Sequence, residues 1–131
     1  MIKLFEKYNN IKEMKDLLFK KSVQTGEIKI VDFFLNKGYD INNEEALVQA
    51  CYDPFVMFAH LVEKGINLEE FEDSWDFKRR LQNDLDLQKS IINLGKEQII
   101  YDTVGFDSRL KYDPKYKDII DRFEDAEKYN L

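Results

Sequence analysis

Three glycines recur in the same setting along this chain of 131 residues. Gly38, Gly65 and Gly95 lie 27 and 30 residues apart, and each closes a stretch of helical periodicity that ends in two large apolar residues. A glycine just after a helix accepts the positive φ that terminates the helix. A regular return of helix, apolar pair and glycine is typical of stacked helix–turn–helix units.

Apolar residues follow a period of three to four over most of the chain, which predicts an all-α fold. The expected helices cover residues 2–23, 27–37, 43–51 and 55–64, then 74–82, 85–95 and 114–129, with a possible break at Asn9 and Asn10. Residues 96–101 could extend a helix, and residues 105–112 are expected to form a loop. Strand-like alternation occurs only briefly, at residues 27–30. An all-α bundle unrelated to repeats is the alternative architecture.

The charge of the chain limits its partners. Twenty basic and 26 acidic side chains give a net charge of −6, with a pI near 4.9. An acidic surface repels phosphate, so the composition argues against nucleic acid and anionic membranes as partners. The chain has no apolar run near the ~20 residues that cross a bilayer and no secretory signal. Its single cysteine suits a reducing compartment, so we expect a cytoplasmic domain.

Residues 26–42 resemble the second helix and exit turn of an ankyrin repeat. Gly26 opens the segment, a helix rich in valine, phenylalanine and leucine follows, and residues 38–42 (Gly-Tyr-Asp-Ile-Asn) match the Gly-x-Asp-x-Asn turn of that family. A second unit is similar, with small residues Ala50 and Cys51 in its first helix and residues 61–67 ending its second. The resemblance spans residues 10–95 and is poorest in the third unit. It implies a short ankyrin-like stack that binds protein through exit-turn residues, which by matching position are Tyr39, Asp40, Asn42 and Asn67.

The chain also departs from the ankyrin family. It lacks the Thr-Pro-Leu-His segment, and its units are shorter than the ~33 residues of that repeat. Only residues 42–45 separate the first exit turn from the next helix, so we expect the projecting β-hairpins to be reduced or missing. The predicted organisation is one domain over residues 1–131. Within it we expect an N-terminal helical unit (1–23), repeat units (24–95) and a C-terminal capping segment (96–131).

Neither the histidine nor the cysteine predicts catalysis. His60 is the only histidine, whereas a zinc site needs three or four ligands. Cys51 lies on an apolar helix face, where cysteine typically acts as a small hydrophobic residue. Nine residues and a helix break separate it from His60, so a nucleophile–base pair is not expected. We expect a protein that is not an enzyme and holds no metal or cofactor; an enzyme that uses paired carboxylates is the alternative.

The acidic run, residues 69–76, is the sharpest local feature. Five carboxylates and two aromatic residues stand there without a basic residue. One interpretation is a solvated turn before a helix N-terminus, with Phe71 and Trp75 in the core. The other is a docking surface, in which Trp75 anchors a basic partner that the carboxylates steer. A calcium site would require an EF-hand spacing and glycine that the run lacks. Residues 78–80 (Lys-Arg-Arg) are interpreted as an internal counter-charge.

These patterns predict a non-catalytic protein-binding module. Its small size and acidity fit, more narrowly, an inhibitor that neutralises a basic protein, such as an immunity protein against a nuclease toxin or an anti-defence protein. A structural adaptor that self-assembles is a further alternative. The expected binding residues are Tyr39, Asp40, Asn42, Asn67, Glu69, Glu70, Glu72, Asp73 and Trp75.

Overall fold

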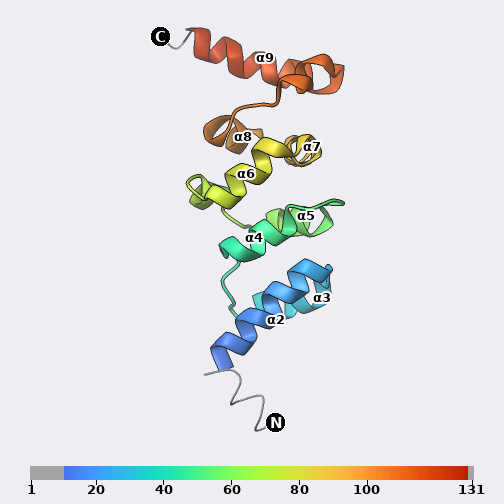
Figure 1. Cartoon of the computed structure of the whole chain (residues 1–131), viewed down its shortest axis with the longest axis vertical. Coiled ribbons are helices and arrows are strands. Elements are labelled where there is room, and N and C mark those ends of the chain that lie inside the picture. Colours follow the sequence, from blue (N-terminus) through green and yellow to red (C-terminus); the bar gives the residue numbers. More distant parts are fainter. Residues whose placement is uncertain (1–10, 130–131) are drawn as a thin grey trace. The chain divides into compact units, whose positions relative to one another are not determined.

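The computed structural model describes residues 11–129, which are mostly helical and contain no strand (Figure 1). The α-helices are α2 (Ile11–Thr25), α3 (Ile28–Asn36), α4 (Glu44–Ala50), α5 (Val56–Glu63), α6 (Trp75–Asn83), α7 (Leu85–Asn93), α8 (Glu97–Thr103) and α9 (Pro114–Tyr129). Two short 3-10 helices, η1 (Leu68–Phe71) and η2 (Ser108–Tyr112), join them. The predicted all-α class is therefore confirmed. None of the helices within 11–129 has the length and apolar character to cross a membrane.

Helices α2 and α3, α4 and α5, and α6 and α7 pack together as neighbours along the chain; α7 also packs against α8, and α2 against α4. Helices α3, α5 and α7, the second members of the first three pairs, end in the same hydrogen-bonded turn. At Gly65, where φ is +98°, the glycine amide donates to the Val62 carbonyl (3.1 Å) and the Ile66 amide donates to the Leu61 carbonyl (3.1 Å). The same two bonds occur at Gly38 and Gly95. The prediction that these three glycines end helices is confirmed, and the apolar pair before each glycine supplies the accepting carbonyls.

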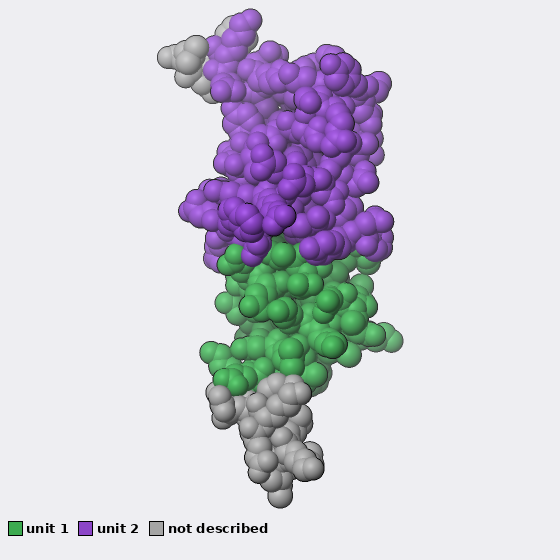
Figure 2. All heavy atoms as spheres, in the orientation of Figure 1, with its two compact units in different colours: residues 1–50, 56–66 green, residues 51–55, 67–131 purple. Residues whose placement is uncertain are grey.

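The chain forms two compact units, shown in different colours in Figure 2. Unit 1 contains α2–α5 and unit 2 contains residues 51–55, η1, α6–α8, η2 and α9. Each has its own apolar core of fully buried side chains. These are Phe19, Val31, Leu47, Phe58 and Leu61 in unit 1, and Phe77, Leu81, Leu87, Ile91, Ile100 and Leu110 in unit 2. The division into segments 1–23, 24–95 and 96–131 remains a prediction.

Several helix boundaries follow from local capping. The Asn43 side chain accepts from the Ala46 amide (3.0 Å), which starts α4, and Ser74 and Asp84 cap α6 and α7 in the same way. Asp113 accepts from the Lys115 amide (3.0 Å) and precedes Pro114, and this Asp-Pro pair starts the helix expected over residues 114–129.

Other boundaries differ from the expectations. The helix expected from residue 55 begins at Val56, because Phe55 adopts a φ of +65° that no helix contains. Residues 96–101 do not extend the preceding helix, since the turn at Gly95 separates α8 from α7. The loop expected at 105–112 contains η2. The predicted helix over 2–23 is observed from Ile11 onward, and the break expected at Asn9 and Asn10 lies outside the described residues.

One buried polar side chain connects several elements of unit 2 by hydrogen bonds. Gln88 on α7 is 2% exposed, and its amide nitrogen donates to the Leu81 carbonyl at 2.9 Å. Its amide oxygen accepts from the Asp107 backbone amide at 2.9 Å. Gln88 thus joins α6, α7 and the loop before η2 through groups that would otherwise be buried without partners.

Candidate functional site

The acidic run begins at a self-contained turn. The Asn67 side chain accepts from the Glu69 amide (3.2 Å) at the start of η1, and the Ser74 side chain accepts from the Phe77 amide (3.3 Å) at the start of α6. Because Asn67 and Ser74 cap these helices, the carboxylates of the run are not needed as caps. Glu69, Glu70 and Asp73 are exposed and Glu72 is half-buried. The run therefore presents negative charge to solvent.

Trp75 is exposed, which corrects the interpretation that placed both aromatic residues of the run in the core. Phe71 is 6% exposed, as that interpretation expected, whereas Trp75 is 67% exposed. The buried face of α6 is formed by Phe77 and Leu81, four residues apart, and Trp75 in the first turn lies off that face. The Arg79 guanidinium lies over the Trp75 ring, 5.2 Å from the ring centroid. The result is a large aromatic surface beside the acidic run.

The basic residues that follow the run are used internally in two different ways. The Arg80 guanidinium donates to the Cys51 carbonyl (2.6 Å) and to the Asp84 carboxylate (2.7 Å), and it lies over the Tyr52 ring at 4.2 Å. Lys78 lies 3.9 Å from Asp73, at the limit of an ion pair. Arg80 therefore ties residues 51–52 to α6, whereas Lys78, like Arg79 on the Trp75 ring, lies against the acidic run itself.

Of the four predicted exit-turn residues, three lie in unit 1 and one lies in unit 2. The Tyr39 ring packs on Phe19 with centroids 4.5 Å apart, and its hydroxyl donates to the Asp16 carboxylate. Burial, and then the bond to Asp16, raise the Tyr39 pKa far above its ordinary value. Asp40 accepts from the Asn42 amide (2.9 Å) within the turn. These three exit-turn residues line one groove of about 620 Å³ in unit 1, whereas Asn67 belongs to unit 2.

Cys51 and His60 have separate roles in packing. The Cys51 side chain is fully buried, and burial raises the thiol pKa to about 12. His60 Nε2 lies 2.6 Å from the Asp32 carboxylate, so α5 is joined to α3. No pattern in the sequence pairs His60 with Asp32, because the two residues lie 28 positions apart and on different helices.

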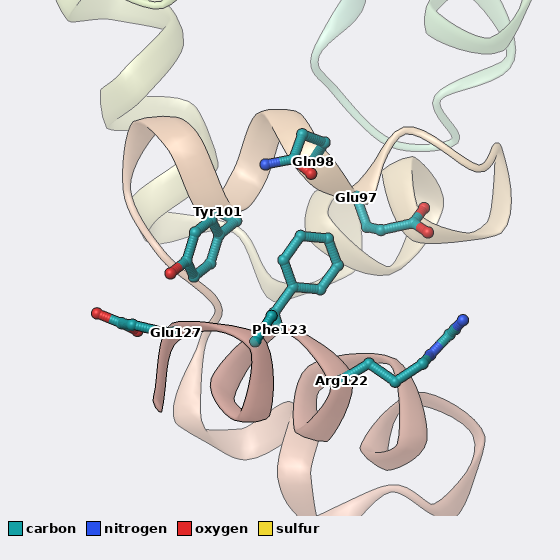
Figure 3. A pocket seen from close by; sticks show the side chains of 7 residues that line it. Glu97, Gln98, Tyr101, Arg122, Phe123 and Glu127 are labelled. Carbon is teal, nitrogen blue, oxygen red and sulfur yellow. The ribbon is translucent and has the colours of Figure 1, made fainter. Parts of the chain in front are cut away.

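A groove lies between α8 and α9, and no motif in the sequence predicted it (Figure 3). It has a volume of about 700 Å³. The Tyr101 and Phe123 rings form its wall with centroids 5.1 Å apart, and Phe106 packs behind Phe123 at 5.2 Å. Partial burial and a hydrogen bond to Glu127 raise the Tyr101 pKa. The periodic placement of residues 122, 123, 126 and 127 on one helix face was the available signal, but nothing in the sequence paired that face with α8.

Within residues 11–129, no group of three or more histidine, cysteine, aspartate or glutamate side chains is placed to hold a metal ion. Comparison of the chain with models of protein families, with curated proteins and with solved structures found no match.

Proposed function

We propose that this chain is a non-catalytic protein-binding module that docks through the acidic run and Trp75. The observation that carries the proposal is the exposure of Trp75, 67% of whose surface reaches solvent next to exposed carboxylates. Tryptophan and arginine are enriched among the residues that dominate binding energy, and here Arg79 lies on the Trp75 ring. The carboxylates of Glu69, Glu70 and Asp73 supply the steering charge.

The proposed scaffold is a short ankyrin-like stack. Its support is the repetition of one plan, in which α2–α3, α4–α5 and α6–α7 are packed helix pairs that each end in the same glycine turn. Repeats of this kind present adjacent turns as a continuous binding surface.

More narrowly, we propose that the chain inhibits a basic protein, of the kind that a nuclease toxin or a defence enzyme represents. The net charge of −6 and the acidic run favour a basic partner over an acidic one. An inhibitor acts by covering its target, so it needs no catalytic groups of its own.

The first test is affinity capture from the native cell with wild type, Trp75→Ala and a matched control, Tyr112→Ala. Tyr112 is 88% exposed and lies on η2, away from the acidic run in sequence. We expect Trp75→Ala to lose the captured partner and Tyr112→Ala to retain it, because a central anchor typically costs 2 kcal/mol or more, roughly thirtyfold in affinity, when truncated. Equal capture by both variants would remove Trp75 from the proposal.

The second test separates a docking surface from a solvated turn. Glu69, Glu70, Glu72 and Asp73 are changed together to amides, and the association rate with the captured partner is followed against ionic strength. Exposed charges act over about 8 Å at physiological salt, so the variant should associate more slowly at low salt and converge with wild type at high salt. Two coincident lines would mean that the run only forms a turn.

Self-assembly is a second candidate, favoured by the apolar surface of α2 and α3. Five side chains there are between 42% and 57% exposed: Ile11, Leu17, Leu18, Ile30 and Phe33. Size-exclusion chromatography with light scattering distinguishes the two, because a binding module is monomeric without its partner and an adaptor is not.

A further inference from the structure

A groove of about 520 Å³ runs along α6 in unit 2. Four side chains of α6, spaced so that they share one helix face, line it: Trp75, Lys78, Arg79 and Gln82. Thr103 and Val104, at the end of α8, complete the lining. The charged side chains of this groove are both cations, although the chain as a whole carries a net charge of −6.

The groove offers hydrogen-bond donors that the protein itself leaves unused. Within residues 11–129, the Arg79 guanidinium forms no ion pair and the indole N–H of Trp75 has no acceptor. The Lys78 amine reaches only the Asp73 carboxylate, 3.9 Å away, and that carboxylate is fully exposed. Because no carboxylate lines the groove, its lining is complementary to an anionic group that accepts hydrogen bonds.

The Trp75 ring restrains Arg79 in this groove. The guanidinium lies 5.2 Å from the ring centroid, and it has several N–H donors, so this contact leaves donors for another acceptor. A guanidinium that is already positioned loses less conformational freedom when a ligand binds. Its planar arrangement of N–H groups matches the two oxygens of a carboxylate.

The carboxylates nearest to the groove in sequence do not fill this role. Asp76, three residues before Arg79 on α6, is exposed and forms no ion pair within the described part of the chain. Asp102 accepts from the Gln98 side chain at 2.9 Å, and neither carboxylate lines the groove. Their charges still oppose an incoming anion, so the groove should bind a free carboxylate weakly and contribute mainly within a larger interface.

We propose that this groove binds a glutamate or aspartate side chain of the protein partner. The carboxylate accepts from the Arg79 guanidinium, Lys78 adds positive charge, and the apolar part of the incoming side chain packs on Trp75 and Val104. The inference rests on the proposed function in taking Trp75 as the docking centre. It deepens that function, because the acidic run selects a basic surface and the groove selects a carboxylate beside it. Basic proteins without that carboxylate are then discriminated against.

The experiment is an NMR titration of the ¹⁵N-labelled full chain with the peptide acetyl-Gly-Glu-Gly-amide. Acetyl-Gly-Gln-Gly-amide, which is nearly the same shape and uncharged, is the matched ligand. Trp75 is the only tryptophan of the chain, so its indole N–H gives a single signal at the groove. We expect weak, saturable shifts of this signal, with at least about tenfold weaker binding of the glutamine peptide, as the loss of a charge-assisted hydrogen bond implies. Equal shifts with both peptides, or no shift of the indole signal, would overturn the proposal.

Variants complete the test. Arg79→Gln should lose about tenfold in affinity for the glutamate peptide, whereas Asp76→Asn should bind it more tightly, because a neighbouring negative charge is removed. Arg122→Gln is the matched control: Arg122 is an exposed arginine on α9 that does not line the groove, and its loss should leave the affinity within about twofold. An equal loss in Arg79→Gln and Arg122→Gln would reduce the effect to net charge and contradict the proposal.

The two proposals fail separately. The titration uses no partner, so the absence of peptide binding removes the groove and leaves the capture result for Trp75 as it stands. Equal capture by Trp75→Ala and Tyr112→Ala removes the docking surface, whereas the difference between the two peptides is measured on the chain alone.

Discussion

A single polar side chain in an apolar core stabilises the fold only when its buried polar atoms all have hydrogen-bond partners. Gln88 meets that condition, since its nitrogen and oxygen bond the backbone of α6 and of the loop before η2. Replacing it with an apolar residue of similar size would leave the Leu81 carbonyl and the Asp107 amide without these partners.

We therefore expect Gln88→Leu to lower the free energy of unfolding by about 2–3 kcal/mol, since each buried group left unsatisfied costs about 1–3 kcal/mol. Urea unfolding followed by circular dichroism measures the change. Gln82→Leu, on the exposed side of α6, is the matched control and should change stability by less than about 0.5 kcal/mol. A similar loss in both variants would show that the glutamine bonds are not responsible.

Cys51 gives a pH-dependent prediction at the same scale. Burial raises the thiol pKa to about 12 in the folded chain, whereas the unfolded chain keeps the ordinary, lower value. The folded state therefore holds the thiol proton more tightly, and this contribution to stability is full below about pH 9 and is lost as the pH rises toward 12. We expect Cys51→Ala to lose less stability than wild type between pH 8 and pH 10.5. At pH 8 the native thiol should react with Ellman's reagent only as fast as the chain opens; immediate reaction would contradict its burial.

Between elements, the bond from His60 to Asp32 joins α5 to α3 inside unit 1. The two atoms are 2.6 Å apart and the His60 side chain is 12% exposed, so solvent screens the pair only in part. By contrast, Lys117 and Asp121 lie 2.6 Å apart on the exposed surface of α9, one helical turn from each other.

A double-mutant cycle with His60→Gln and Asp32→Asn should give a coupling energy of about 1 kcal/mol in unfolding free energy. The matched cycle with Lys117→Gln and Asp121→Asn should give a smaller coupling, because water competes for both partners. A larger coupling on α9 than between α3 and α5 would contradict this order. Neither His60→Gln nor Cys51→Ser should abolish partner binding under conditions where the variant is folded, since neither residue lies on the proposed surface.

At the scale of the whole molecule, the net charge bears on the exposed apolar side chains of α2 and α3, because copies that carry the same charge repel each other. The net charge is −6 at pH 7 and falls to zero near pH 4.9. Repulsion between molecules therefore vanishes as the pH approaches 5.

We expect light scattering to detect association near pH 5 at concentrations where the chain is monomeric at pH 7.5. Phe33, which is 57% exposed, should contribute to it, so Phe33→Gln should reduce the association. Tyr112→Gln changes an even more exposed aromatic residue on η2 and should not. If the two variants behave alike, the association does not use α3.

The sequence predicted the helix ends and buried faces, which depend on residues close together in the chain. It did not predict the contacts between residues that lie far apart in the chain. The glycine turns, the caps at Ser74 and Asp113 and the buried face of α4 follow from residues within one or two helical turns. The exposure of Trp75, the Asp32–His60 bond and the α8–α9 groove depend on which helix face meets which neighbour. One sequence carries no signal for such pairing when the partners lie more than 20 residues apart. Most of the fold could therefore be predicted, and so could the residues of the candidate surface, but the sequence left open whether Trp75 is exposed or buried in the core.

The glycine turns also make the stability of the chain depend on the chirality of the residue at each turn. A Cβ atom built on Gly65 meets nothing within 4 Å, yet the φ of +98° is one that residues of the L series rarely adopt. Gly65→Ala should therefore destabilise the chain by about 1–2 kcal/mol through backbone conformation alone. A D-alanine, whose preferred φ has the opposite sign, should be tolerated better than L-alanine at the same position. Chemical synthesis of the two diastereomers would separate chirality from crowding, and identical stabilities would mean that the turn does not depend on the mirror-image backbone.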